Sequence, residues 1–149
     1  MKINGQKLSS INTKTLKFPR PDAEPVIITL AAISNPNLFD EVIPDPEPPM
    51  IIAAGGEKVT DFNDKEYIKK SEEKASLYPY WLIITALQAT EGLEFEKVKL
   101  DDPSTWKEID DEIFESGFNL GERSEILVWV NRLNGIDQDY VDEARKNFT

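Results

Sequence analysis

A run of four prolines within six residues constrains this chain more than any other feature of its sequence. Proline donates no backbone hydrogen bond and disfavours helix in the residue before it, so the run must be extended. It consists of Pro44, Pro46, Pro48 and Pro49. We interpret it as a spacer between a β-rich half and a helical half, although such segments also serve as ligands for aromatic grooves.

The sequence around this spacer predicts an α+β fold, with a small N-terminal β-hairpin or sheet region followed by a mainly helical C-terminal part. The expected parts are a β-rich region at 1–43, the Pro-rich linker with a Gly-Gly loop at 44–62, and a helical region at 63–149. A chain of 149 residues can equally form a single domain from all three.

Short strands are predicted before the spacer. Asn4-Gly5 is typical of a two-residue hairpin turn, because that turn needs positive φ at both positions, and it would join 1–3 to 6–8. Further strands are expected at 15–18 and 26–33, where β-branched residues are frequent, with a Pro-rich turn at 19–25 between them.

The segments next to the spacer predict a short helix and a glycine turn. Asn35-Pro36 indicates a capped helix start, and that helix should run to about Val42. After the spacer, Met50–Ala54, Gly55-Gly56 and 57–60 predict either a second hairpin or a loop that carries an exposed apolar patch.

A long helix is predicted at 65–90, capped by Asn63 or Asp64 and ended by Gly92. Because Pro79 lies inside it, we expect either a kink or two helices that meet there. The first half is polar and predicted to be solvated, whereas the second half is apolar nearly all round and belongs in the core.

The last third of the chain predicts three more helices. Residues 93–100 alternate imperfectly and indicate a short edge strand or an extended loop. Helices should then begin at Asp102-Pro103, at the Asn119–Glu122 capping box and at Asp137. The side chains expected in the core of this region and of the long helix are Trp81, Trp106, Ile109, Ile113, Trp129, Tyr140, Val141, Ala144 and Phe148.

Composition excludes several functional classes. The 28 acidic and 17 basic residues give a net charge of −11, which repels nucleic acid and anionic membrane surfaces. The chain has no His and no Cys, so the commonest general base, the thiol nucleophile and the usual zinc ligands are missing. We therefore expect no catalytic, cofactor-binding or metal-binding residues, and no enzyme activity. No signal peptide or membrane-spanning run is visible, which predicts a cytoplasmic protein.

Several short motifs resemble, in the same order, those of tail assembly chaperones of tailed bacteriophages. These motifs are PRPDAEPV (Pro19–Val26), PEPP (Pro46–Pro49) with the Gly-Gly loop after it, DPSTW (Asp102–Trp106), ESGF (Glu115–Phe118) and EARKNF (Glu143–Phe148). The resemblance implies a protein without catalytic residues that binds the tape-measure and tail tube proteins during tail assembly. It also implies that the protein works in the cytoplasm of the infected host cell and is absent from the mature virion.

Two other functions remain open from the sequence. The chain could be a structural or adaptor protein that stays in the virion, or a small regulatory binding module. A chaperone needs an apolar surface that is exposed within an acidic shell. Met50, Ile51 and Ile52 fit this description, because they lie between the stiff Pro-rich spacer and the flexible Gly-Gly. The other interpretation is that these three residues form an ordinary strand.

Overall fold

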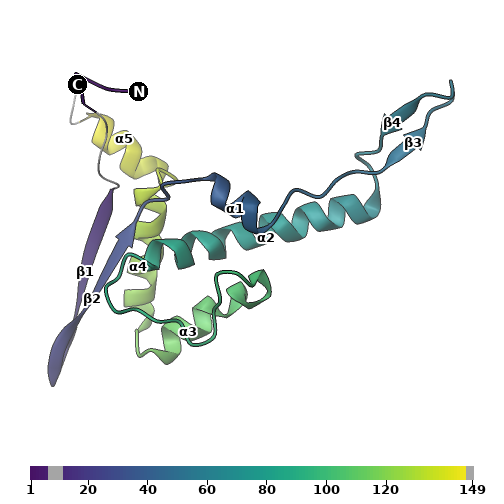
Figure 1. Ribbon diagram of the computed structural model, residues 1–149. Coiled ribbons are helices and arrows are strands. Elements are labelled where there is room, and N and C mark those ends of the chain that lie inside the picture. The colour runs from purple at the N-terminus through teal and green to yellow at the C-terminus, as the bar shows by residue number, and fades with distance from the viewer. Residues whose placement is uncertain (7–11, 147–149) are drawn as a thin grey trace.

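A two-stranded antiparallel sheet, β1 (Thr13–Arg20) and β2 (Ala23–Ala31), begins the α+β fold, and most of the remaining chain is helical (Figure 1). The structure is a computed structural model that describes residues 1–6 and 12–146. One face of the sheet is buried, as the period of two along a strand requires, and its buried residues are Leu16, Phe18, Ile28 and Leu30.

The turn between these strands is shorter than the sequence predicts. It consists of Pro21 and Asp22 alone, so both strands extend into the expected 19–25 turn. Pro19 is accommodated because the strand register shifts between Phe18 and Arg20, and an irregularity of this kind tolerates a residue without an N–H.

The predicted Asn4-Gly5 turn is confirmed. Both residues have positive φ, 53° and 79°, and Ile3 and Gln6 exchange backbone hydrogen bonds of 2.7 and 3.0 Å across the turn. Of the second expected strand, 6–8, the residues after Gln6 lie outside the described residues.

Helix α1 (Asn37–Val42) leads into the Pro-rich run, and we call residues 37–49 the strap. The Asn35 side chain accepts a hydrogen bond from the N–H of Asn37 at 3.0 Å, although Pro36 is the N-cap residue. After the strap, β3 (Met50–Ile52) and β4 (Lys58–Thr60) form a second antiparallel hairpin. Of the two alternatives for 50–60, the chain therefore forms the hairpin.

Helix α2 (Lys65–Leu87) is continuous through Pro79, so the alternative of two separate helices is wrong. Its N-cap is Asp64, whose carboxylate accepts from the N–H of Tyr67 at 2.9 Å. The helix ends three residues before the predicted Thr90. The Thr90 hydroxyl instead accepts from the N–H of Thr29 in β2 at 3.0 Å and donates to its carbonyl at 2.9 Å.

Residues 93–100 form a loop without a regular strand, so the edge-strand alternative is wrong. The reason is a buried carboxylate: Glu112 accepts hydrogen bonds from the backbone N–H groups of Glu96, Lys97 and Val98, which a strand would use for pairing. The helix expected from Pro103 is divided into a 3₁₀ turn, η1 (Pro103–Glu108), and α3 (Ile109–Glu115).

Two more helices complete the chain, α4 (Leu120–Leu133) and α5 (Gln138–Lys146). The predicted Asn119–Glu122 capping box is present, with hydrogen bonds of 2.9 and 3.1 Å in the two directions. The expected apolar stripe of the last helix, Tyr140, Val141, Ala144 and Phe148, lies outside the described side chains.

The sheet and the helices contribute to one hydrophobic cluster. Trp106, Ile109 and Ile113 are buried as predicted, and so is Trp81. Trp129 is only partly buried at the edge of the cluster, where Lys14 lies 4.3 Å from its ring centre. No helix in residues 1–6 and 12–146 is both long and apolar enough to cross a membrane.

An ion pair fastens the tip of the first sheet to α4. Arg20 donates to both carboxylate oxygens of Glu122, at 2.8 and 3.2 Å, and this glutamate is buried. The hydrogen bonds from Arg20 lower the pKa of Glu122 below its ordinary value, against the opposing effect of burial. Glu122 therefore serves both as a capping residue and as the anchor of the sheet.

Replacing Glu122 by Gln should lower the free energy of unfolding at pH 7 by about 2 kcal/mol, because charged hydrogen bonds are lost. Since the folded state lowers the pKa of Glu122, its stabilisation is present above the unfolded pKa of 4.5 and is lost as the pH falls through the folded pKa. Urea melts from pH 7 to pH 2 should show a smaller acid loss for Glu122→Gln than for the parent. Equal acid losses would contradict this role, and the exposed Glu125→Gln is the control.

Replacing Pro79 by Ala should leave the stability unchanged or raise it by up to about 2 kcal/mol, because the new N–H can donate to the carbonyl of Ala75. Thermal and urea melts would measure the change. Ser76→Pro, three residues earlier in the same helix, should cost about 3 kcal/mol and calibrates the effect. A clear loss on Pro79→Ala would instead mean that the proline ring fills space which alanine leaves empty.

Candidate docking surface

The β3–β4 hairpin projects beyond one end of α2, while the β1–β2 sheet lies near the other end (Figure 1). The three residues singled out from the sequence are exposed there: Met50 by 57%, Ile51 by 47% and Ile52 by 73%. They are paired as a strand and exposed at the same time, so the two interpretations of this segment are compatible. The structure places all three together on one short element.

The hairpin presents apolar side chains on both faces. Ile51 pairs with Val59, and both point to one face, whereas Met50 and Ile52 point to the other. Val59 is also exposed. A two-stranded hairpin this short has little stability of its own. Its exposed apolar side chains therefore contribute little to the stability of the fold.

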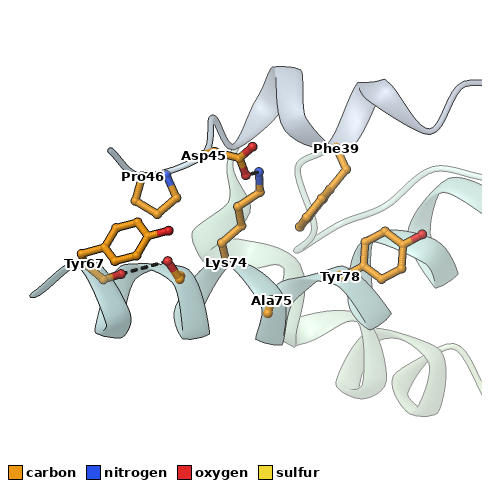
Figure 2. A pocket seen from close by; sticks show the side chains of 8 residues that line it. Phe39, Asp45, Pro46, Tyr67, Lys74, Ala75 and Tyr78 are labelled. Atoms are coloured by element: carbon orange, nitrogen blue, oxygen red, sulfur yellow. Dashed lines mark hydrogen bonds and ion pairs between the residues drawn. The ribbon is translucent and has the colours of Figure 1, made fainter. Parts of the chain in front are cut away.

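The strap is held against α2 by a buried lysine (Figure 2). Lys74 is 9% exposed, and its ammonium group donates to Asp40 at 2.6 Å and to Asp45 at 2.5 Å. It also lies 5.4 Å from the ring centre of Phe39. Burial by itself would lower the pKa of Lys74, but the hydrogen bonds and charges of the two carboxylates outweigh it and leave the pKa raised.

This lysine corrects the expectation that the whole first half of the long helix is solvated. The other charged residues of 65–73 are exposed, but Lys74 is not. A signal was present in the sequence: Lys74 stands four residues before Tyr78 and seven before Trp81, so it shares their face of the helix. Its partners Asp40 and Asp45 lie 34 and 29 residues away in the sequence, and no local sequence pattern indicates that they pair with Lys74.

Beside the strap runs an open groove of about 530 Å³, which we call the Tyr67 groove (Figure 2). Helix α2 forms the floor of this groove, and the strap forms one wall. Figure 2 shows the Pro46 ring over Tyr67, and the aromatic ring of Phe39 directed towards α2. The lining residues are Phe39, Asp45, Pro46, Tyr67, Ser71, Lys74, Ala75 and Tyr78.

The chemistry of this surface is apolar contact with acidic charge at its edge. Within the described residues, no three acidic side chains are grouped so that they could hold a metal ion. The one deeply placed carboxylate on α3, Glu112, is engaged by the 93–100 loop. What the hairpin and the groove offer is exposed apolar area with negative charge at its edge.

Comparison with protein-family models, with curated proteins and with solved structures found no match to this chain. The motifs that resemble the tail assembly chaperones can nevertheless be located in the fold. Pro19–Val26 covers the β1–β2 turn, Pro46–Pro49 ends the strap, and Asp102–Trp106 contains the cap of η1. These three motifs supply turns and a helix cap, and Pro46 also lines the Tyr67 groove.

Replacing Lys74 by Met keeps the buried stem but removes the ammonium group, and it should cost about 2 kcal/mol from the lost charged hydrogen bonds. Because the folded state raises the pKa of Lys74, its stabilisation is complete below the unfolded pKa of 10.5 and is lost as the pH rises through the folded pKa. Urea melts from pH 7 to pH 12 should show this alkaline loss in the parent and not in Lys74→Met.

The control is Lys70→Met, because Lys70 pairs with Glu66 at 3.4 Å on the exposed surface of the same helix. Such a surface pair contributes less than about 0.5 kcal/mol, so the control should melt like the parent. Equal losses for the two variants would mean that the strap does not depend on the buried ammonium group.

Proposed function

We propose that this chain is a non-enzymatic tail assembly chaperone of a tailed bacteriophage, which binds the tape-measure and tail tube proteins during tail morphogenesis in the cytoplasm of the infected cell. The observation that carries the proposal is the β3–β4 hairpin, a projecting element with exposed Met50, Ile51 and Ile52. The resemblance of the ordered motifs supplies the class of partner.

An exposed apolar element is useful to a chaperone only if it does not cause the protein to aggregate. The segment 45–66, which contains the hairpin, has six acidic and two basic side chains. Two copies of this region repel each other, while a basic or neutral client is not repelled. The acidic surroundings thus favour a different protein as partner over a second copy of this chain.

The hairpin is also separate from the core. Its side chains are absent from the buried cluster, which is formed by the β1–β2 sheet, α1, α2, the 93–100 loop and the helices that follow. An element that contributes little to stability can change its contacts when a client arrives without unfolding the body. This separation supports a role in binding and makes it testable by substitution.

Replacing Met50, Ile51 and Ile52 together by Ser should leave the melting temperature within about 2 °C of the parent, since none of the three side chains belongs to the buried hydrophobic cluster. The same variant, produced together with the tape-measure protein of the same phage, should fail to co-purify with it. Unfolding of the variant would place these side chains in the core and remove the hairpin as the binding element.

The matched control replaces three exposed apolar side chains outside the hairpin, Ile27, Leu38 and Leu120, by Ser. This control should still co-purify with the tape-measure protein, because the apolar surface that it removes lies outside the hairpin. Mass spectrometry of purified virions tests the fate of the protein. Stoichiometric recovery there would favour the structural or adaptor protein and contradict a chaperone that leaves the particle.

A further inference from the structure

The hydrogen bonds of the β3–β4 hairpin show which of its backbone groups face outward. The N–H of Asp61 donates to the carbonyl of Pro49, and the N–H of Ala53 donates to the carbonyl of Glu57, each at 2.8 Å. In an antiparallel ladder, hydrogen-bonded pairs alternate with pairs whose N–H and C=O groups point away from the partner strand. The hydrogen-bonded positions of this strand are therefore 49, 51 and 53, and the outward-facing positions are the even-numbered ones between them.

Met50 and Ile52 thus direct their backbone groups, two N–H and two C=O, to the open edge of β3. These two residues lie opposite Thr60 and Lys58 in the hairpin. Among the described residues, none forms a hydrogen bond with any of the four groups. The hairpin projects beyond α2 (Figure 1) and Ile52 is 73% exposed, so a partner can reach this edge.

The two edges of the hairpin differ in charge. Exposed strand edges usually carry a charged side chain, often Lys, because their unpaired backbone groups otherwise recruit other strands. Strand β4 carries Lys58 and is preceded by Glu57, whereas the run Met50–Ala54 consists of five apolar residues without a charge. Strand β3 is therefore the unprotected edge of the hairpin.

The side chains of β3 favour a partner that reaches both faces of the hairpin. Ile51 lies on one face, and Met50 and Ile52 lie on the other. A flat partner surface covers one face and leaves the apolar side chains of the other face in water. An added strand places its own side chains alternately on the two faces, so it can cover all three residues.

We infer that the open edge of β3 binds an extended apolar segment of a partner protein as a third strand, through the backbone groups of Met50 and Ile52. Backbone hydrogen bonds supply affinity in this mode of recognition, and alternate side chains supply specificity. The inference rests on the proposed function in one respect, since it assigns the added strand to the client of the chaperone.

The residues before β3 define the end of the added strand. Pro48, the next outward-facing residue, has no N–H, so full pairing ends at Met50. Glu47 is exposed and lies three residues, or about 10 Å, before Met50 along an extended chain. A lysine or arginine at the strap end of the partner segment would neutralise this carboxylate.

Charge favours a different protein over a second copy of this chain as the source of the strand. Two β3 strands could pair about a two-fold axis at Ile51. That arrangement brings together two copies of the segment 45–66, each with six acidic and two basic side chains. A basic segment is attracted to the same charges that repel a second copy.

The test uses a synthetic, fluorescently labelled peptide of about nine residues, in which Val and Thr alternate and lysines stand at both ends. Fluorescence anisotropy would measure its affinity for the full chain. The same peptide with glutamate in place of lysine should bind at least about tenfold more weakly, and salt should weaken the binding of the lysine peptide. Failure of the parent to bind the lysine peptide, or equal binding of both peptides, overturns the inference.

Hydrogen exchange of individual amides, followed by NMR, identifies the mode of binding. In the free chain the N–H groups of Met50 and Ile52 should exchange rapidly, and saturating lysine peptide should slow them at least about tenfold. The outward N–H groups of Lys58 and Thr60, on the edge of β4, should not change. Protection of the β4 edge instead, or of neither edge, overturns the inference.

A proline substitution gives a matched set of variants. Ile52→Pro and Ile52→Ala both shorten the exposed side chain, but only Ile52→Pro removes the outward N–H. Ile52→Pro should therefore bind the lysine peptide at least about fivefold more weakly than Ile52→Ala, because a partner carbonyl loses its donor. Thr60→Pro, on the edge of β4, should bind within about twofold of the parent.

Equal affinities of Ile52→Pro and Ile52→Ala overturn the inference. The exchange measurement uses the parent, so it decides the question where Ile52→Pro disturbs the hairpin. Sedimentation of the chain alone tests the other occupant. Dimers that Ile52→Pro dissociates and Ile52→Ala does not would assign the edge to a second copy, and the inference would be wrong.

Co-production with the tape-measure protein keeps the two proposals apart. Co-purification that Ile52→Pro retains and the serine variant of the hairpin loses supports the chaperone and rejects strand addition. Protection of Met50 and Ile52 by the lysine peptide, without any co-purification by the parent, rejects the chaperone alone.

Discussion

The buried ammonium group of Lys74 determines the arrangement of the surface that this protein presents. By bonding to Asp40 and Asp45, it holds the strap along α2 and so forms one wall of the Tyr67 groove. The strap leads directly into β3, so the same contacts also fix the point from which the hairpin projects. A buried cation is costly unless it is fully paired, and here both partners come from the strap, so the lysine is satisfied only when the strap is docked.

Helix α2 connects two regions with different physical tasks. Its C-terminal half carries Trp81, Ile84 and Leu87 into the core, where they pack with the β1–β2 sheet and the later helices. Its N-terminal half is polar except for the strap side, and it holds the hairpin away from the core. Stability therefore resides mainly at one end of the helix, and the exposed β3–β4 hairpin lies at the other. Changes at the hairpin end can leave the core intact.

The parts of the fold that follow local rules could be predicted from the sequence. The Asn4-Gly5 turn, the Asn119–Glu122 capping box and the buried Ile109 and Ile113 all depend on residues within a few positions of one another. What was missed depends on side chains that meet across long separations. Lys74 pairs with residues 29 and 34 positions away, and Arg20 pairs with Glu122 across 102 positions. No periodicity encodes such pairs, and charged residues normally indicate a solvated face. The hairpin residues of the candidate site could be predicted, but the groove could not, because the strap that forms its wall is placed by these distant ion pairs.

The hairpin and the Tyr67 groove give this small acidic chain two surfaces with different chemistry. The hairpin offers apolar contact on both faces with little loss of order, because the strap already fixes its base. The Tyr67 groove offers apolar contact between α2 and the strap, with the carboxylate of Asp45 at its edge. Each contact alone is small, and small contacts dissociate quickly. Binding of one partner at two linked sites would raise the effective affinity while each site remains separately reversible.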